Sequence, residues 1–177
     1  ENERNFHIFY QILSNDESKF KYHLLDAENY KFLNYKFIKC RDIDDSKEFN
    51  NLLNAFKVMG FTDSKIDDIF KIVASVLHLG NIDFDEDGNI KSKNEINIVS
   101  QLLCLDKKLL IDSICYRYLK TGNEEIKIKM NKEDTNKALN SFVMKLYENT
   151  FNYIVKTIND TLDANCSSFI GILDIFG

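Results

Sequence analysis

The stretch Phe169-Ile-Gly-Ile-Leu-Asp-Ile-Phe-Gly177 carries the most specific information about the fold of this chain. Residues 169–173 are apolar enough for a buried strand, and Asp174 follows at its carboxyl end. An acid held there can bind a water molecule of a bound Mg²⁺, and the Gly177 N–H can approach a terminal phosphate. The stretch therefore predicts half of a nucleotide site. Asp174 and Gly177 are its catalytic and cofactor-binding candidates, and Asp174 is the metal-facing residue, acting through water.

An apolar strand of this kind needs neighbouring strands on both edges and cover on both faces. Residues 1–168 offer few candidates for such strands. A fold is not expected to end on a catalytic loop either. We therefore expect the chain to be a piece of a larger protein, whose missing part supplies the rest of the sheet.

The composition is that of a soluble globular protein of 177 residues, with 44% hydrophobic and 29% charged residues. A net charge of −5 argues against nucleic acid or an anionic membrane as partner, and no segment is apolar for long enough to span a bilayer. The four cysteines form no C-x-x-C pair, which favours reduced core thiols in the cytoplasm. They are Cys40, Cys104, Cys115 and Cys166.

Apolar spacing and capping residues predict a series of helices. Asp44 opens one helix, which Gly60 ends, and Thr62 caps the next, whose last turn holds His78 with Gly80 just past the end. Asn131 caps the longest helix, about 30 residues by its apolar stripe. The other predicted helices cover residues 5–13, 18–25, 95–103 and 106–115.

One hairpin is predicted among these helices. Lys120-Thr-Gly-Asn-Glu124 is typical of a turn, and the alternation of Ile126 and Ile128 with charged residues is typical of a solvent-facing strand. The fold class is therefore mainly α with minor β.

Two further patterns have a functional and a structural interpretation. His78 could be a ligand or a base, but a histidine near a helix C-terminus is more often satisfied in the core. Asp83-Phe-Asp-Glu-Asp-Gly88 has almost the spacing of a calcium loop, yet its twelfth position, counted from Asp83, is Asn94. We favour the structural interpretation in both cases.

Several runs together resemble the myosin motor domain, in order and over essentially the whole chain. The first resembles the segment just after switch I, and the last resembles switch II. The runs are Glu3-Arg-Asn-Phe-His-Ile-Phe-Tyr-Gln11, Met59-Gly-Phe-Thr62, Ile72-Val-Ala-Ser-Val-Leu-His-Leu-Gly-Asn-Ile82, Lys120-Thr-Gly122, Leu146-Tyr-Glu148, Phe151-Asn-Tyr153, Ile158-Asn-Asp-Thr-Leu162 and Leu173-Asp-Ile-Phe-Gly177.

The resemblance implies a P-loop NTPase motor that is an actin-activated Mg-ATPase, located in the cytoplasm on the cytoskeleton. Residues 1–168 would form most of the upper actin-binding subdomain, with a hairpin loop near 118–131. Residues 169–177 would form a central-sheet strand and the start of switch II. The implied cofactors are Mg²⁺ and ATP. The implied partners are the actin filament, the remainder of the motor domain and light chains. Asp174 would face Mg²⁺ through water, and Gly177 would donate its N–H to the γ-phosphate.

The resemblance also implies that the loop from Thr121 to Asn131 touches actin. The family places an acid or a phosphorylatable hydroxyl sixteen residues before a position that aligns with Asn140, and counting back gives Glu124. The expected actin-binding residues are Thr121, Gly122, Asn123, Glu124 and Glu125. A built-in acid would need no kinase. The alternative is that Glu124 is an ordinary solvated turn acid.

The sequence contains no Gly-x-x-x-x-Gly-Lys-Ser/Thr motif and none of the switch I residues. We therefore expect these residues alone to be inactive, and enzymatic activity is an expectation for the intact parent only. Two alternatives are another P-loop enzyme, with residues 174–177 as a GTPase switch, and a helical interaction module without nucleotide chemistry. The helix-rich sequence before residue 169 disfavours the GTPase.

Overall fold

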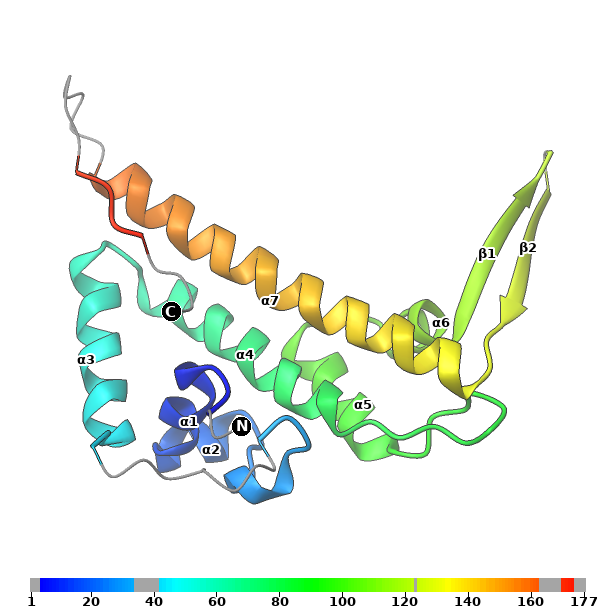
Figure 1. The fold of residues 1–177 in the computed structure, drawn as a ribbon, viewed down its shortest axis with the longest axis horizontal. Helices are drawn as coiled ribbons and strands as arrows, with labels where there is room; N and C mark the ends of the chain where they lie inside the picture. The colour runs from blue at the N-terminus through cyan, green and yellow to red at the C-terminus, as the bar shows by residue number, and fades with distance from the viewer. Residues whose placement is uncertain (1–3, 34–41, 123, 163–169, 174–177) are drawn as a thin grey trace.

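The computed structural model describes residues 4–33, 42–122, 124–162 and 170–173. Figure 1 shows a long helix, α7, lying across a group of shorter helices, with a two-stranded hairpin projecting at one end. The elements are α1 (His7–Leu13), α2 (Asp16–Lys21), η1 (Ala27–Asn29), α3 (Asp45–Val58), α4 (Asp63–Gly80), α5 (Lys93–Leu102), α6 (Lys107–Cys115), β1 (Tyr116–Thr121), β2 (Glu124–Lys129) and α7 (Lys132–Leu162).

Helix α4 is the centre of the core. Every residue from Val73 to Leu79 is buried, and α4 contacts α1, α3, α5 and α7. It begins as predicted, because the Thr62 hydroxyl oxygen accepts a hydrogen bond from the Lys65 N–H. A helix buried on most of its circumference can hold the other helices around it.

The predicted end of α4 was wrong by a residue or two, for a tertiary reason. Gly80 lies inside the helix, and Asn81 is the C-cap. A Cβ atom on Gly80 would lie 2.5 Å from the Phe32 ring. Gly80 is therefore needed for close packing of a distant aromatic side chain, which local sequence could not indicate.

A polar network joins α2 to α4 through Asp67. Its carboxylate accepts a hydrogen bond of 2.7 Å from the Tyr22 hydroxyl and pairs with Lys21 (2.7 Å) and Lys71 (2.9 Å). Partial burial by itself raises the pKa of Asp67, but the hydrogen bonds from these three groups outweigh it and lower the pKa to about 2. The network fixes α2 against α4.

Helix α7 begins as predicted, because the Asn131 side chain accepts a hydrogen bond from the Asp134 N–H at 2.9 Å. Its first half is well covered, with Leu139 and Val143 buried. The second half is not, since Phe151 is 51% exposed and Leu162 is 60% exposed. The predicted one-sided stripe is therefore well covered along the first half of the helix and only partly covered along the second, where Ile154 and Ile158 are half-buried against the core.

The expected buried strand at 169–173 is not formed where the structure describes it. Residues 170–173 have no regular secondary structure, and Ile170 and Ile172 are 97% and 95% exposed. The only sheet among the described residues is the β1–β2 pair, so no strand edge lies beside them to accept their backbone hydrogen bonds.

The structure is mainly helical with one small antiparallel sheet, which confirms the predicted fold class at that level. None of the described helices has the length and apolar character needed to cross a membrane.

Candidate functional site

The hairpin of β1 and β2 is the candidate site that the structure describes. The strands pair antiparallel with Thr121 opposite Glu124, and Gly122 is a turn residue between them. Gly122 has a φ of +63°, in the left-handed region, and no atom lies within 4 Å of a Cβ placed there. The predicted turn is confirmed, and its tip is open to solvent.

The base of the hairpin is held firmly. The Lys127 ammonium group lies 2.6 Å from an Asp112 carboxylate oxygen on α6 and 4.1 Å from the Tyr116 ring centre. The Lys129 ammonium group donates a hydrogen bond to Asn89. The Met130 N–H donates to the Cys115 carbonyl at 2.9 Å. These contacts fix the direction of the hairpin, which points away from the helices in Figure 1.

The expected actin-binding residues gather at the tip. Thr121, Gly122, Glu124 and Glu125 are all exposed, and residue 123 lies outside the described residues. Among the residues that the structure describes, none forms an ion pair or a side-chain hydrogen bond with the Glu124 or Glu125 carboxylate. Both charges are therefore available to a partner.

The two acids lie on opposite faces of the hairpin, because side chains alternate along a strand. The register places Glu124 on the same face as the cross-strand pair Leu119 and Ile126. Leu119 is 46% exposed and Ile126 is 47% exposed. Glu125 shares its face with Lys120 and Lys127. Sequence reasoning missed the Leu119–Ile126 pair, although the alternation around Ile126 was a signal for it.

The structure does not describe the residues that were predicted to contact the nucleotide. Asp174 and Gly177 both lie outside the described residues. The structure therefore places the residues of the hairpin tip and leaves the nucleotide site as an expectation.

His78 is satisfied in the core, and the acidic loop is held by hydrogen bonds of its own. His78 is 4% exposed, and its Nε2 lies 3.1 Å from the Tyr22 carbonyl oxygen, which makes Nε2–H the donor. Burial lowers the pKa of the imidazole. In the loop, the Asp85 carboxylate accepts from the Asn89 backbone and side chain. Within the described ranges, no group of three or more His, Cys, Asp or Glu side chains could hold a metal ion.

Comparison with known proteins identifies the family. The model of the family described as myosin head (motor domain) matches residues 1–177. The chain is 30% identical over 189 residues to unconventional myosin-Ib of Mus musculus, with 99% of this chain and 17% of the relative covered. It is 35% identical over 183 residues to a probable myosin heavy chain of Encephalitozoon cuniculi, with 99% and 11% covered. It is 34% identical over 184 residues to myosin type-2 heavy chain 1 of Schizosaccharomyces pombe, with 99% and 12% covered.

The chain thus spans less than a fifth of the length of these relatives. The family match, in contrast, covers it from end to end. This protein belongs to the myosin head (motor domain) family.

Proposed function

We propose that this chain is part of an actin-based motor whose intact form couples Mg-ATP hydrolysis to movement along actin filaments. Residues 1–168 form its upper actin-binding subdomain in this proposal, and residues 169–177 enter its central sheet. The observation that carries the proposal is the match of the myosin head model to the whole chain. The intact motor works in the cytoplasm, on the cytoskeleton, with light chains as further partners.

The hairpin is the proposed contact with actin. Its base is fixed by Lys127 and Lys129, while its tip presents Glu124 without a partner among the described side chains. A charged side chain on a rigid hairpin can bind a surface of opposite charge without the entropy cost of ordering a flexible loop. Glu124 supplies a permanent negative charge, so this contact needs no phosphorylation.

The proposed nucleotide contacts are Asp174 and Gly177. A bound Mg²⁺ neutralises charge on the phosphates, and an Asp carboxylate can hold one of its water ligands. The Gly177 N–H can donate to a γ-phosphate oxygen only while that phosphate is present. Hydrolysis and release of the phosphate remove this hydrogen bond, and the segment around residues 174–177 can then change position.

The test of the hairpin assignment is a charge series in the intact protein. Glu124→Lys should lower the actin-activated ATPase rate at a subsaturating actin concentration by roughly threefold to tenfold, and Glu124→Gln should lower it less. Both should leave the rate without actin within about a factor of two, because Glu124 lies at the exposed tip.

Glu28→Lys is the matched control. Glu28 is an exposed acid of η1, and no described residue pairs with its carboxylate. The substitution makes the same change in net charge at a site away from the hairpin. If Glu124→Lys lowered the rates with and without actin equally, or acted no more strongly than Glu28→Lys, the assignment of Glu124 would be wrong.

A further inference from the structure

The register of β1 and β2 divides the hairpin into two faces, because side chains alternate along each strand. The face that we call the Glu124 face carries Glu124, Leu119 and Ile126. The opposite face, which we call the lysine face, carries Tyr116, Tyr118, Lys120, Glu125, Lys127 and Lys129. Within the described ranges, the ion pair and the side-chain hydrogen bond that join the hairpin to the rest of the chain both start from the lysine face.

Asp112 of α6 is the main partner of the lysine face. Its carboxylate lies 2.6 Å from the Lys127 ammonium group, which also lies 4.1 Å from the centre of the Tyr116 ring. Tyr116 directly follows α6 and is half-buried against the core. The Asp112 side chain is only 20% exposed, so solvent screens this pair less than it screens a pair on the open surface. Lys127 therefore joins strand β2 to helix α6.

A second contact holds the same face from another side. Lys129, two residues beyond Lys127, donates a hydrogen bond to Asn89 in the loop between Phe84 and Ile90. Asn89 is itself fixed, because the Asp85 carboxylate accepts from its backbone and its side chain, both at 2.8 Å. A helix and a loop thus hold the lower half of the lysine face. In the part of the chain that the structure describes, the upper half of the hairpin has no such contact.

These contacts decide which face of the hairpin is turned outward. The lysine face is turned toward α6 and the loop, and the Glu124 face is therefore turned away from them. Three residues separate Lys127 from Glu124, which is roughly 10 Å along a strand at about 3.3 Å per residue. A two-stranded hairpin has little rigidity of its own, so a small rotation at the base displaces the tip. The direction of Glu124 thus depends on a contact on the opposite face.

We propose that Asp112 is a positioning residue for the contact with actin. By holding Lys127, it keeps the Glu124 face of the hairpin turned outward. This inference rests on the proposed function, in which the hairpin binds actin. Without the ion pair, the hairpin spends part of its time in other directions, and its apparent affinity falls by the fraction of time lost. A partly exposed pair shifts such an equilibrium by a factor of about two to five.

The test is the ATPase rate of the intact protein measured against actin concentration. Asp112→Asn keeps the shape of the side chain and removes its charge. It should raise the actin concentration that gives half-maximal activation by about twofold to fivefold. The plateau rate and the rate without actin should stay within about 1.5-fold of the wild-type values, because Asp112 affects only the encounter with actin.

Variants of Lys127 show whether Asp112 acts through this contact. Lys127→Gln should have the same effect as Asp112→Asn, and the double variant should shift the half-activating concentration no further than the larger single effect. Lys127→Arg keeps the positive charge and can lie over the Tyr116 ring, so it should stay within about twofold of the wild type.

Glu133→Gln is the matched control. Glu133 is an exposed acid in the first turn of α7, and its carboxylate lies 2.6 Å from the Lys137 ammonium group. The substitution removes one negative charge and one ion pair, as Asp112→Asn does, but the ion pair that it removes lies within α7. It should change the half-activating actin concentration by less than about 1.5-fold.

Amide hydrogen exchange without actin tests the anchor independently of the proposed function. The Met130 N–H donates to the Cys115 carbonyl at the base of the hairpin. In the intact protein, this amide should exchange about twofold to fivefold faster in Asp112→Asn than in the wild type, and at the wild-type rate in Glu133→Gln.

Two results in a protein that actin activates would overturn the proposal. One is that Asp112→Asn acts no more strongly than Glu133→Gln. The other is that the effects of Asp112→Asn and Lys127→Gln multiply in the double variant, because the two residues would then act separately. A folded wild-type protein without activation by actin would instead disprove the proposed function, and the exchange rate of Met130 would still decide whether Asp112 holds the hairpin.

Discussion

At the scale of single residues, capping side chains were the most reliable signals in the sequence. Asp44, Thr62 and Asn131 all cap helices as predicted, and each does so through bonds to backbone N–H groups two or three residues on. Such bonds depend on local sequence alone, which is why they could be predicted. The burial of His78 was also predicted. Its partner, the carbonyl of Tyr22, is 56 residues away in the sequence and could not be.

His78 should make the stability of the fold sensitive to mild acid. Burial lowers the pKa of its imidazole below the ordinary 6.5, so the folded state resists protonation. Below about pH 6.5 the unfolded chain binds a proton that the folded chain does not, and the free energy of unfolding falls. This contribution is complete above pH 6.5 and is lost as the pH falls through the lowered pKa of the folded state.

Urea unfolding of the chain at pH 7.5 and pH 5.5 checks this. The free energy of unfolding should fall by up to about 1.4 kcal/mol per pH unit across the window, while the His78→Gln variant, whose side chain does not titrate there, should show a smaller fall. His7 and His23 are exposed and are present in both proteins. An equal fall in both proteins would exclude His78 as the cause.

At the scale of elements, local pattern predicted the existence of the helices and the hairpin better than their ends. The predicted end of α4 failed because Gly80 is required by Phe32, far away in the sequence. The strand expected at residues 169–173 is not formed at residues 170–173. A strand needs a neighbouring strand to pair with, and the described residues provide none there. The hairpin tip was predictable because a turn and its alternating arm are both local features.

The loop between Phe84 and Ile90 should depend strongly on Gly88. Its φ is +72°, and a Cβ there would collide with the Met130 backbone carbonyl and approach the Thr135 hydroxyl to 2.9 Å. Gly122 has a similar φ of +63° but open space around it. Ala at either position has the cost of a left-handed backbone, about 1 kcal/mol, and only Gly88→Ala adds a steric cost of about 1–3 kcal/mol.

Urea unfolding of Gly88→Ala beside Gly122→Ala separates these two costs. Gly88→Ala should lose more free energy of unfolding than Gly122→Ala by at least about 1 kcal/mol. Similar losses would mean that the loop can move away from the start of α7, and that the close approach of Gly88 to Met130 contributes little to the fold.

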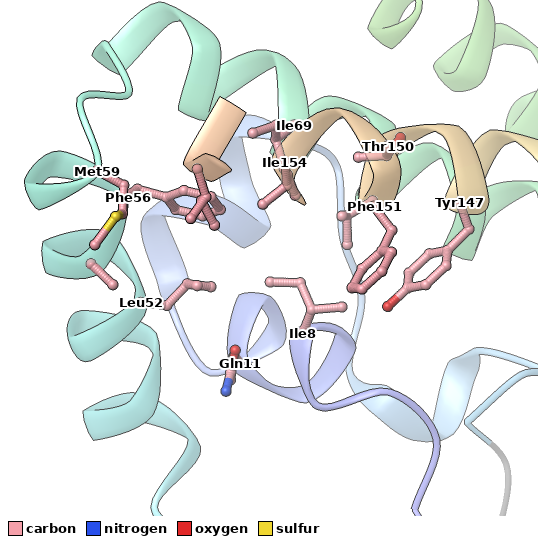
Figure 2. Close-up of a pocket in the computed structure, with 13 residues that line it drawn as sticks. Ile8, Gln11, Leu52, Phe56, Met59, Ile69, Tyr147, Thr150, Phe151 and Ile154 are labelled. Atoms are coloured by element: carbon pink, nitrogen blue, oxygen red, sulfur yellow. The ribbon is translucent and has the colours of Figure 1, made fainter. Parts of the chain in front are cut away.

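At the scale of the whole molecule, the sequence indicated the family, and the comparisons confirm it. The sequence could not show that an apolar groove of about 260 Å³ lies between α1, α3, α4 and α7 (Figure 2), because its lining comes from residues 8 to 158 and is assembled only by tertiary packing. The residues around 174–177, which carry the predicted nucleotide contacts, lie outside the described structure. Their role in nucleotide binding is a proposal from the motif and from the family.

The chain of residues 1–177 should not bind nucleotide by itself. Its sequence contains no Gly-x-x-x-x-Gly-Lys-Ser/Thr motif, so it lacks the backbone cradle and lysine that hold ATP phosphates in this class of enzymes. Isothermal calorimetry with Mg-ATP should give no saturable heat up to about 1 mM, whereas the intact protein should bind. A dissociation constant of about 10 μM or tighter for the chain alone would contradict the assignment.

The most direct test of the account is the steady-state rate of Mg-ATP hydrolysis by the intact protein, measured against increasing concentrations of filamentous actin. The account predicts a low rate without actin and a rise to a plateau as actin is added, because the proposed function is that of a motor activated by actin. A rate that does not change with actin, in a protein that hydrolyses ATP and is folded, would contradict it.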